Sequence, residues 1–199
     1  VAVEVNKENI GRCPNYQIAQ ADVYRLPYPE NTFDIVLCLG VIQHTPSPEK
    51  TMQALWKMVK PGGLLVIDHY TFDWMYFIKP IMFYRFFLKR MNPKKAKNAV
   101  EKLVAFFFPL HWKYRTNKLM TLLLNRISPC YVYINTFGNM GYDFNFNLSR
   151  LDTYDGLTDY YKHLRSKQQI ENILNSLNPL KVDVWHGGNG VEARAIKQS

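Results

Sequence analysis

Residues 20–70 read QADVYRLPYPENTFDIVLCLGVIQHTPSPEKTMQALWKMVKPGGLLVIDHY. Two apolar runs, FDIVLCLGV at 33–41 and LLVI at 64–67, flank one amphipathic helical pattern. Strands that are joined through a helix of this length run parallel. The stretch therefore predicts an α/β fold with a Rossmann-like, doubly wound sheet.

The helix between the two runs has clear boundary signals. Ser47 is a suitable N-cap, and Pro48 follows at the first helical position, where a missing N–H costs nothing. Pro-Gly-Gly at 61–63 is expected to stop the helix and turn the chain into the next strand. The apolar residues that recur at helical spacing are Met52, Leu55, Met58 and Val59.

Candidate ligand-binding residues follow the predicted strands. Residues 16–21 are expected to form a further short strand, with Asp22 just past its end. In open α/β sheets ligands bind beyond the carboxyl ends of the strands. The places to search are therefore Asp22, residues 39–44 and residues 68–70.

The run QADVYRLPYPENTFDIVLCLGVIQHT, followed by LWKMVKPGGLLVIDHY, resembles the middle of a class I S-adenosylmethionine-dependent methyltransferase. The resemblance is strong over residues 14–70 and looser over about the last 35 residues. It implies S-adenosylmethionine as cofactor and methyl transfer by in-line displacement to a small-molecule or lipid-like acceptor. Because the sulfonium is already activated, positioning would supply most of the catalysis.

The resemblance also assigns cofactor-binding residues. Asp22 would accept a hydrogen bond from the adenine amino group, and the backbone N–H of Val23 would contact the ring. Leu39, Gly40 and Val41 would line the methionine part of the cofactor. Read from the residues alone, Asp22 could instead cap a helix or a turn, and residues 39–41 could be an ordinary strand end.

Histidines near the predicted strand ends are candidates for catalysis. A histidine has the side-chain pKa nearest neutrality, so His44 or His163 could act as a base if the acceptor is protonated at neutral pH. For His44 the alternative role is packing or capping, and for His163 the alternative is the solvated start of a helix. The candidates for substrate binding are His69, Tyr70, Tyr161 and Arg165, the last two within the polar and aromatic segment YDGLTDYYKHLRS at 154–166.

Two elements of the family pattern do not occur in these 199 residues. The family has a Gly-rich loop after its first strand and an acidic residue after its second, and the run G-x-G-x-x-G is not found after any predicted strand. Residues 1–9 (VAVEVNKEN) read like the helix that follows the second strand. We therefore expect an N-terminally truncated member of the family.

Domain organisation follows from a change in composition. Residues 1–71 form the first part of the predicted core, residues 72–150 a basic, aromatic helical insertion, and residues 151–199 the last part of the core. Within the insertion we expect a break at Pro80, a helix over 93–108 ended by Pro109, and a helix over 117–127. Residues 131–137 alternate and predict a strand or extended loop, and residues 139–147 look irregular.

The insertion carries the charge imbalance of the whole chain, whose formal net charge is +9. Residues 72–128 hold twelve basic and two acidic residues, a net charge of +10. They could form a lid over a hydrophobic substrate, a peripheral contact with an anionic membrane, or a cap whose aromatics fill its own core. Nucleic acid is an unlikely partner because no nucleic-acid-binding motif is found.

The last part of the core has a capping box and a hairpin signal. Ser166 and Gln169 predict the start of a helix. Residues 180–185 and 191–196 then predict two antiparallel strands joined by Gly-Gly-Asn-Gly at 187–190, which is a turn and no phosphate loop.

The three cysteines, at 13, 38 and 130, have no metal-ligand spacing and suit a reducing, cytoplasmic location. No metal site is predicted. The alternative to an enzyme is a non-catalytic binding module with a methyltransferase-like fold, which would use the basic insertion on a membrane surface or a partner.

Overall fold

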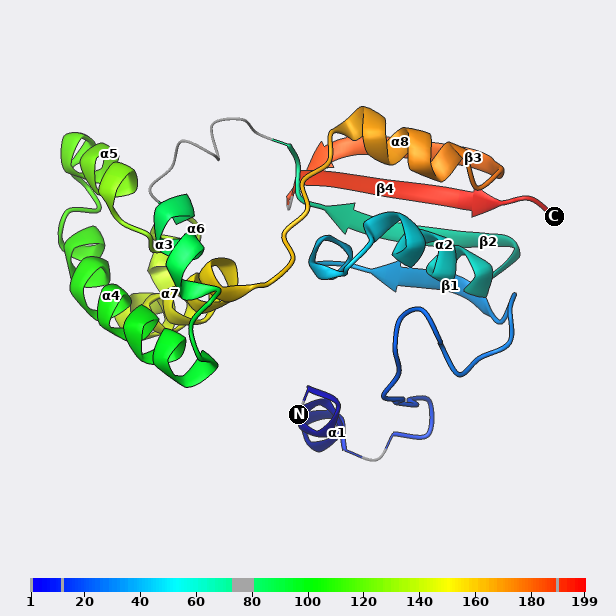
Figure 1. The fold of residues 1–199 in the computed structure, drawn as a ribbon, viewed down its shortest axis with the longest axis horizontal. Helices are drawn as coiled ribbons and strands as arrows, with labels where there is room; N and C mark the ends of the chain where they lie inside the picture. Colours follow the sequence, from blue (N-terminus) through cyan, green and yellow to red (C-terminus); the bar gives the residue numbers. More distant parts are fainter. Residues whose placement is uncertain (1, 12, 73–80, 189) are drawn as a thin grey trace. The chain divides into compact units, whose positions relative to one another are not determined.

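The structure, a computed structural model, describes residues 2–11, 13–72, 81–188 and 190–199. The chain forms two compact units. Val1–Phe72 and Tyr161–Ser199 form the first, which we call the sheet unit, and Asp73–Tyr160 form the second, the helical unit (Figure 1).

The sheet unit is built on a four-stranded sheet in the order β1-β2-β4-β3. The strands are β1 (Phe33–Cys38), β2 (Val59–His69), β3 (Pro179–Gly187) and β4 (Gly190–Lys197). β1 and β2 are parallel, and β4 is antiparallel to both β2 and β3. The α/β class and the C-terminal antiparallel hairpin are therefore confirmed.

Two helices pack on the strands, and both begin as their caps predict. α2 (Pro48–Met58) links β1 to β2, and the Ser47 side chain accepts a hydrogen bond from the backbone N–H of Lys50. α8 (Lys167–Asn175) begins at Ser166, which forms a complete capping box with Gln169. α2 contacts β1 and β2, and α8 contacts β3 and β4.

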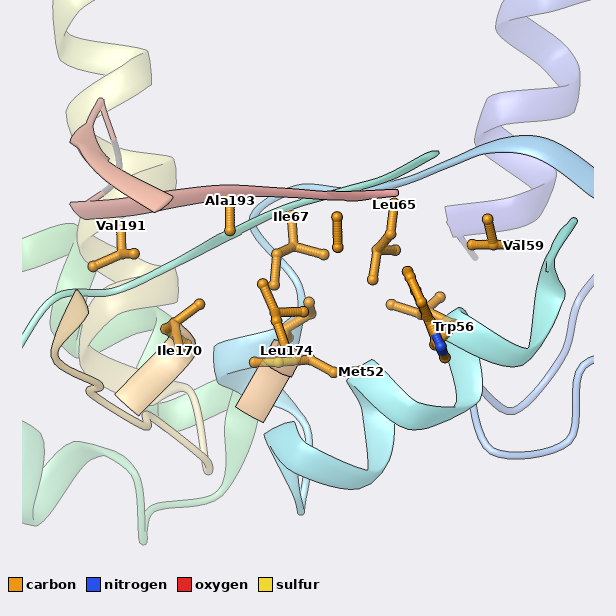
Figure 2. Close-up of a cluster of buried hydrophobic side chains, with 12 residues drawn as sticks. Met52, Trp56, Val59, Leu65, Ile67, Ile170, Leu174, Val191 and Ala193 are labelled. Atoms are coloured by element: carbon orange, nitrogen blue, oxygen red, sulfur yellow. The ribbon is translucent and has the colours of Figure 1, made fainter. Parts of the chain in front are cut away.

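The core of the sheet unit lies between these helices and the sheet. Figure 2 shows Met52 and Trp56 of α2 and Leu174 of α8 pointing toward Leu65 and Ile67 of β2. Each of these side chains is buried. Since fully burying one large apolar side chain contributes about 1.5–3 kcal/mol, this cluster fixes the helices against the strands.

The Pro-Gly-Gly segment lies inside β2, and the prediction that it ends the helix is wrong. α2 ends at Met58, and β2 begins at once with Val59 opposite Phe33. The next pair is Leu64 with Ile35, so the register shifts across residues 60–63. Gly62 has φ +76, which a residue with a side chain adopts only with strain.

The N-terminal part of the sheet unit differs from expectation in one respect. α1 (Ala2–Ile10) is the predicted first helix, but residues 16–21 form no strand. A strand exists only where a neighbour satisfies its backbone groups, and among the described residues β1 pairs with β2 alone. The apolar run at 33–41 also ends early, because a 3-10 turn, η1 (Ile42–His44), follows β1.

The helical unit consists of six helical segments in its described part. They are α3 (Ile81–Leu88), α4 (Pro93–Lys113), α5 (Lys118–Ile127), α6 (Ile134–Phe137), the 3-10 turn η3 (Gly138–Met140) and α7 (Gly141–Thr158). α4 packs on α7, and its core includes Val100, Val104, Phe108 and Leu157. The predicted helical insertion is therefore confirmed.

α4 continues through Pro109, where the sequence predicts its end. Proline removes one helical hydrogen bond and costs about 3 kcal/mol in a helix interior. Phe108 and His111, on either side of it, are buried, and Tyr114 N–H still bonds the carbonyl of Leu110. The stabilisation from packing the last turn of α4 therefore exceeds the cost of the proline inside the helix.

Residues 131–147 are also more helical than predicted. The strand or extended loop expected at 131–137 ends in α6, and the irregular segment expected at 139–147 is η3 and the start of α7. α7 runs across the domain boundary that the sequence places at residue 150. The expected break at Pro80 lies outside the described residues.

Candidate functional site

Gly40 lies just past the end of β1 and has an open environment. Its φ is +71, and a Cβ placed there would meet no atom within 4 Å. Its N–H donates a 2.5 Å hydrogen bond to the carboxylate of Asp68, at the same end of the neighbouring strand β2. The flanking Leu39 and Val41 expose about half of their surface. Residues 39–41 therefore form an exposed apolar surface, which we call the shelf, where a ligand can approach the backbone closely. The hydrogen bond to Asp68 holds this segment in place.

Asp22 lies in a tight turn that is tied to the same side of the sheet unit. Its carboxylate accepts a 2.9 Å hydrogen bond from the backbone N–H of Tyr24. The Tyr24 hydroxyl accepts a 3.0 Å hydrogen bond from the backbone N–H of Ser47, the N-cap of α2. Val23 packs against the core cluster that includes Ile42. Since Ile42 and Ser47 both belong to the connection that follows β1, the Asp22 turn lies beside that connection.

Residues 69 and 70 close the carboxyl end of β2. His69 is fully buried, and its Nδ1 lies 3.0 Å from the carbonyl oxygen of Tyr70. A carbonyl only accepts, so Nδ1 carries the proton. Burial lowers the pKa of His69, so its imidazole is neutral at neutral pH. The Tyr70 ring meets the His44 ring edge to face, with 5.4 Å between centroids.

The segment that precedes α8 joins the ends of both parallel strands. The N–H of His163 donates to the carbonyl of Gln43 at 2.9 Å, and the N–H of Arg165 donates to the carbonyl of Tyr70 at 3.0 Å. His44 Nδ1 lies 3.2 Å from the carbonyl oxygen of Tyr161. Residues 161–165 therefore hold His44, Tyr70 and His163 in one neighbourhood at the carboxyl edge of β1 and β2.

Arg165 is engaged in an ion pair with Glu49 of α2. Its Nε and Nη2 donate to Glu49 Oε1 at 3.0 and 2.7 Å. Burial alone would raise the pKa of Glu49, but the hydrogen bond and charge of Arg165 outweigh it and hold that pKa below its usual value. The ion pair connects residues 161–165 to the start of α2. Arg165 therefore has a structural role in addition to its predicted place near the site.

Three polar side chains of this neighbourhood have buried atoms with no hydrogen-bond partner among the residues that the structure describes. They are both amide atoms of Gln43, Nε2 of His69 and Nε2 of His163. Leaving a buried polar group unsatisfied costs about 1–3 kcal/mol, so native proteins rarely keep such groups without a use for them.

All eleven predicted site residues belong to the sheet unit. The searched ranges 39–44 and 68–70 contain Gln43 and Asp68, but the sequence assigned no site role to them or to Glu49. Gln43 is followed by a more obvious histidine, and the other two act through partners far away in the chain. Asp155 and Tyr160, from the same polar segment as His163, belong to the helical unit. Among the described residues no group of three or more His, Cys, Asp or Glu could hold a metal ion.

Comparison with known proteins gives a match for the first third of the chain. Residues 1–67 match a family model described as "Methyltransferase domain". The chain is 32% identical over 63 residues to the ubiquinone/menaquinone biosynthesis C-methyltransferase UbiE of Enterobacter sp. (strain 638), covering 32% of this chain and 25% of that protein. It is 30% identical over 97 residues to the UbiE protein of Pasteurella multocida, covering 46% of this chain and 34% of that protein.

The chain therefore spans about a quarter to a third of the length of these curated relatives. Among solved structures, it aligns with the CMeT domain of the citrinin polyketide synthase at a TM-score of 0.49 and 12% identity. That alignment covers 99% of this chain and 36% of the other.

Proposed function

Because residues 1–67 match a family model of methyltransferase domains, we propose that the protein transfers a methyl group from S-adenosylmethionine to a small, quinone-like acceptor. The observation that carries the proposal is the open shelf at Gly40, which lies within the matched residues at the carboxyl end of a parallel strand. The family match also weighs against a module without enzymatic activity.

The residues at the edge of the sheet fit the cofactor. The Asp22 carboxylate is exposed and suits the adenine amino group, and the backbone of Val23 lies next to it. Leu39, Gly40 and Val41 provide apolar contact and close backbone approach for the methionine part. When bound, S-adenosylmethionine supplies a methyl group that is already activated by the positive sulfonium.

His44 is the proposed base. Its Nδ1 proton points to the carbonyl of Tyr161, so in the neutral ring Nε2 carries the lone pair. When the acceptor atom forms its bond to the methyl carbon, it must lose a proton, and His44 Nε2 accepts that proton. His163 is the second candidate, since its Nε2 is buried next to the same segment without a partner.

Aromatic side chains near His44 suit a planar acceptor. Tyr161 and His163 stack with 12° between their planes, and Lys162 places its ammonium 5.1 Å from the centre of the Tyr70 ring. Flat apolar faces bind a flat ring, and a nearby cation favours the partial negative charge of a quinone-type oxygen. His69, Tyr70, Tyr161 and Arg165 are therefore proposed to orient the acceptor.

The test compares two glycine substitutions in the full-length gene product. Gly40→Ala and Gly62→Ala both place a side chain at a positive φ with open space around the new methyl group, so their backbone strain is matched at about 1–2 kcal/mol. Gly40 lies at the proposed cofactor shelf, whereas Gly62 lies in the register shift near the opposite end of β2. We expect Gly40→Ala to weaken S-adenosylmethionine binding by about tenfold or more, and Gly62→Ala to leave it nearly unchanged.

Isothermal titration calorimetry with S-adenosylmethionine and its demethylated product measures both variants. Methyl transfer from radiolabelled cofactor to a quinol analogue measures the second half of the proposal. If neither nucleoside binds the wild-type protein, the enzyme assignment is overturned. If both variants bind S-adenosylmethionine with equally reduced affinity, the cofactor site does not lie at Gly40. Cofactor binding without transfer to any quinol would exclude only the acceptor class.

A further inference from the structure

α5 turns an apolar face outward. Leu119, Leu122, Leu123 and Ile127 are 76%, 65%, 51% and 47% exposed, and Leu124 is the one buried residue of this helix. The four exposed positions recur at helical spacing and share one side of the helix. An ordinary surface helix buries such a stripe against its own core, so the orientation of α5 is the reverse of the usual one.

The orientation is fixed by specific contacts on the other side of the helix. Asn117 caps the first turn by accepting from the N–H of Met120 at 3.1 Å, and the Thr121 hydroxyl donates to the carbonyl of Tyr114 at 3.2 Å. Leu124 is buried to 3% exposure. The core of the helical unit is filled instead by side chains such as Phe108 and Trp112, whose rings stack. The exposed leucines are therefore not required by that core.

The surroundings of this face are positively charged. Residues 102–142 contain five basic residues and no Asp or Glu. Lys118 and Arg126 lie on α5 itself and are exposed, and Arg115 is exposed just before it, with its guanidinium 4.6 Å from the centre of the Trp112 ring. An apolar stripe with cations at both ends favours a partner that is apolar and negatively charged.

This combination discriminates between possible partners. A second copy docking through the same face would bring Lys118 and Arg126 of two chains together and create like-charge repulsion. Nucleic acid would need aromatic side chains for base stacking, and the exposed stripe of α5 is aliphatic. The surface of an anionic bilayer offers both acyl chains and negative headgroups.

We propose that α5 docks in the plane of an anionic lipid bilayer, with Leu119, Leu122, Leu123 and Ile127 entering the boundary between headgroups and acyl chains. No helix in the described residues is long and apolar enough to cross a bilayer, and an in-plane helix needs no such length. Burying four aliphatic side chains supplies the apolar part of the affinity, and the charges of Lys118 and Arg126 add attraction to the anionic surface. This inference is independent of methyl transfer.

The experiment is vesicle co-sedimentation of the full-length gene product. One set of vesicles is pure phosphatidylcholine, and the other contains about 30% phosphatidylglycerol as the source of negative charge. Wild-type protein should sediment with the anionic vesicles and be released by added salt. The variant Leu122→Ser/Leu123→Ser should lose at least about tenfold in partition coefficient, and Lys118→Glu/Arg126→Glu a similar amount.

Matched controls come from the same unit. Leu151→Ser removes an exposed leucine of α7, and Lys95→Glu reverses an exposed charge on α4; both should bind like the wild type. Circular dichroism checks that each variant is folded. No binding to anionic vesicles, or undiminished binding of the Leu122→Ser/Leu123→Ser variant, would overturn the proposal. So would a wild-type dimer that this variant dissociates, since α5 would then be a protein interface.

Discussion

The three cysteines differ in surroundings, and therefore in reactivity. Burial raises the pKa of Cys38 to about 11, with a further contribution from the charge of Asp68, and burial raises the pKa of Cys130 to about 11. Cys13 is exposed. Since only the thiolate reacts, we expect an aromatic disulfide reagent at neutral pH to modify Cys13 at least about a hundredfold faster than the other two.

The measurement is the time course of native protein, with the modified residues located by peptide mass spectrometry. Cys13→Ser removes the fast phase and is the control. Fast modification of Cys38 would contradict its position on the buried side of β1. In denaturant all three thiols should react at similar rates, because the pKa shifts come from the fold.

At the level of single residues, the sequence could identify positions but not partnerships. Gly40 could be placed from the sequence because it follows an apolar run that forms β1, whereas Asp22 was placed after a strand at 16–21 that the structure does not form. Arg165 was predictable as a charged residue of the site region, but its pairing with Glu49, 116 positions away, was not. Gln43 became a candidate only when its two amide atoms were found buried without partners.

The next scale is that of helices, where α3 is held to α7 by a buried charge. The Arg85 guanidinium pairs with the Asp159 carboxylate and donates to the carbonyls of Gly156 and Asp159 at 3.0 and 2.6 Å. Both charged side chains are almost fully buried. We expect Arg85→Met to lower the free energy of unfolding of the helical unit by about 3–5 kcal/mol, because it leaves the Asp159 carboxylate buried and uncompensated.

Urea unfolding followed by circular dichroism measures the change. Arg90→Met is the matched control, because Arg90 lies on the exposed side just after α3 and its guanidinium stacks on Phe86. That variant should lose less than about 1 kcal/mol. The double variant Arg85→Met/Asp159→Leu should recover part of the free energy of unfolding that Arg85→Met loses. If Arg85→Met, Arg90→Met and the double variant all lose the same amount, the buried ion pair is contradicted.

Helices with local boundary signals were predictable, and those shaped by packing were not. α2, α5 and α8 begin at Ser47, Asn117 and Ser166, whose side chains accept from the first turn. α7 has no side-chain cap, and its buried face includes Asn145, Ser149 and Thr153, so it shows no apolar stripe. Its helical state depends on contacts with α4 and with residue 131, which no local pattern reveals.

Considering the molecule as a whole, two buried histidines link stability to pH. Burial lowers the pKa of His69 in the sheet unit and of His111 in the helical unit. Unfolding restores the ordinary value near 6.5, so the unfolded chain takes up protons first as the pH falls below it. We therefore expect the free energy of unfolding to decrease as the pH drops below about 6.5, and to be nearly constant just above neutrality.

Urea titrations between about pH 5 and 7.5 measure this slope. His69→Gln/His111→Gln should flatten it, whatever its effect on absolute stability. His186→Gln changes an exposed histidine of β3 and should leave the slope as it is in the wild type. A wild-type slope that persists in the double variant would show that other groups cause the pH dependence.

For the whole chain, the sequence predicted the four strands of the sheet, but it also predicted a fifth strand at 16–21 that does not form. Alternation and turn residues identified β3 and β4, and the parallel pair followed from the helix between β1 and β2. Charge counting located the basic unit, but the exposed stripe on α5 depends on which side of that helix is buried, and the structure buries the side that carries Leu124. Residues 16–21 carry a strand pattern without a neighbour, and pattern alone cannot supply one.

The outer side of β1 has a consequence for handling the protein. Within the described residues its hydrogen bonds go only to β2, and Ile35 and Leu37 project exposed from it. An unpaired edge strand with exposed aliphatic side chains is a template to which the same strand of another molecule can add by backbone hydrogen bonding. Such addition can repeat indefinitely, because it forms no closed assembly. We therefore expect concentrated stocks of the 199 residues to form fibrillar aggregates through β1, which a dye that reports cross-β structure would detect.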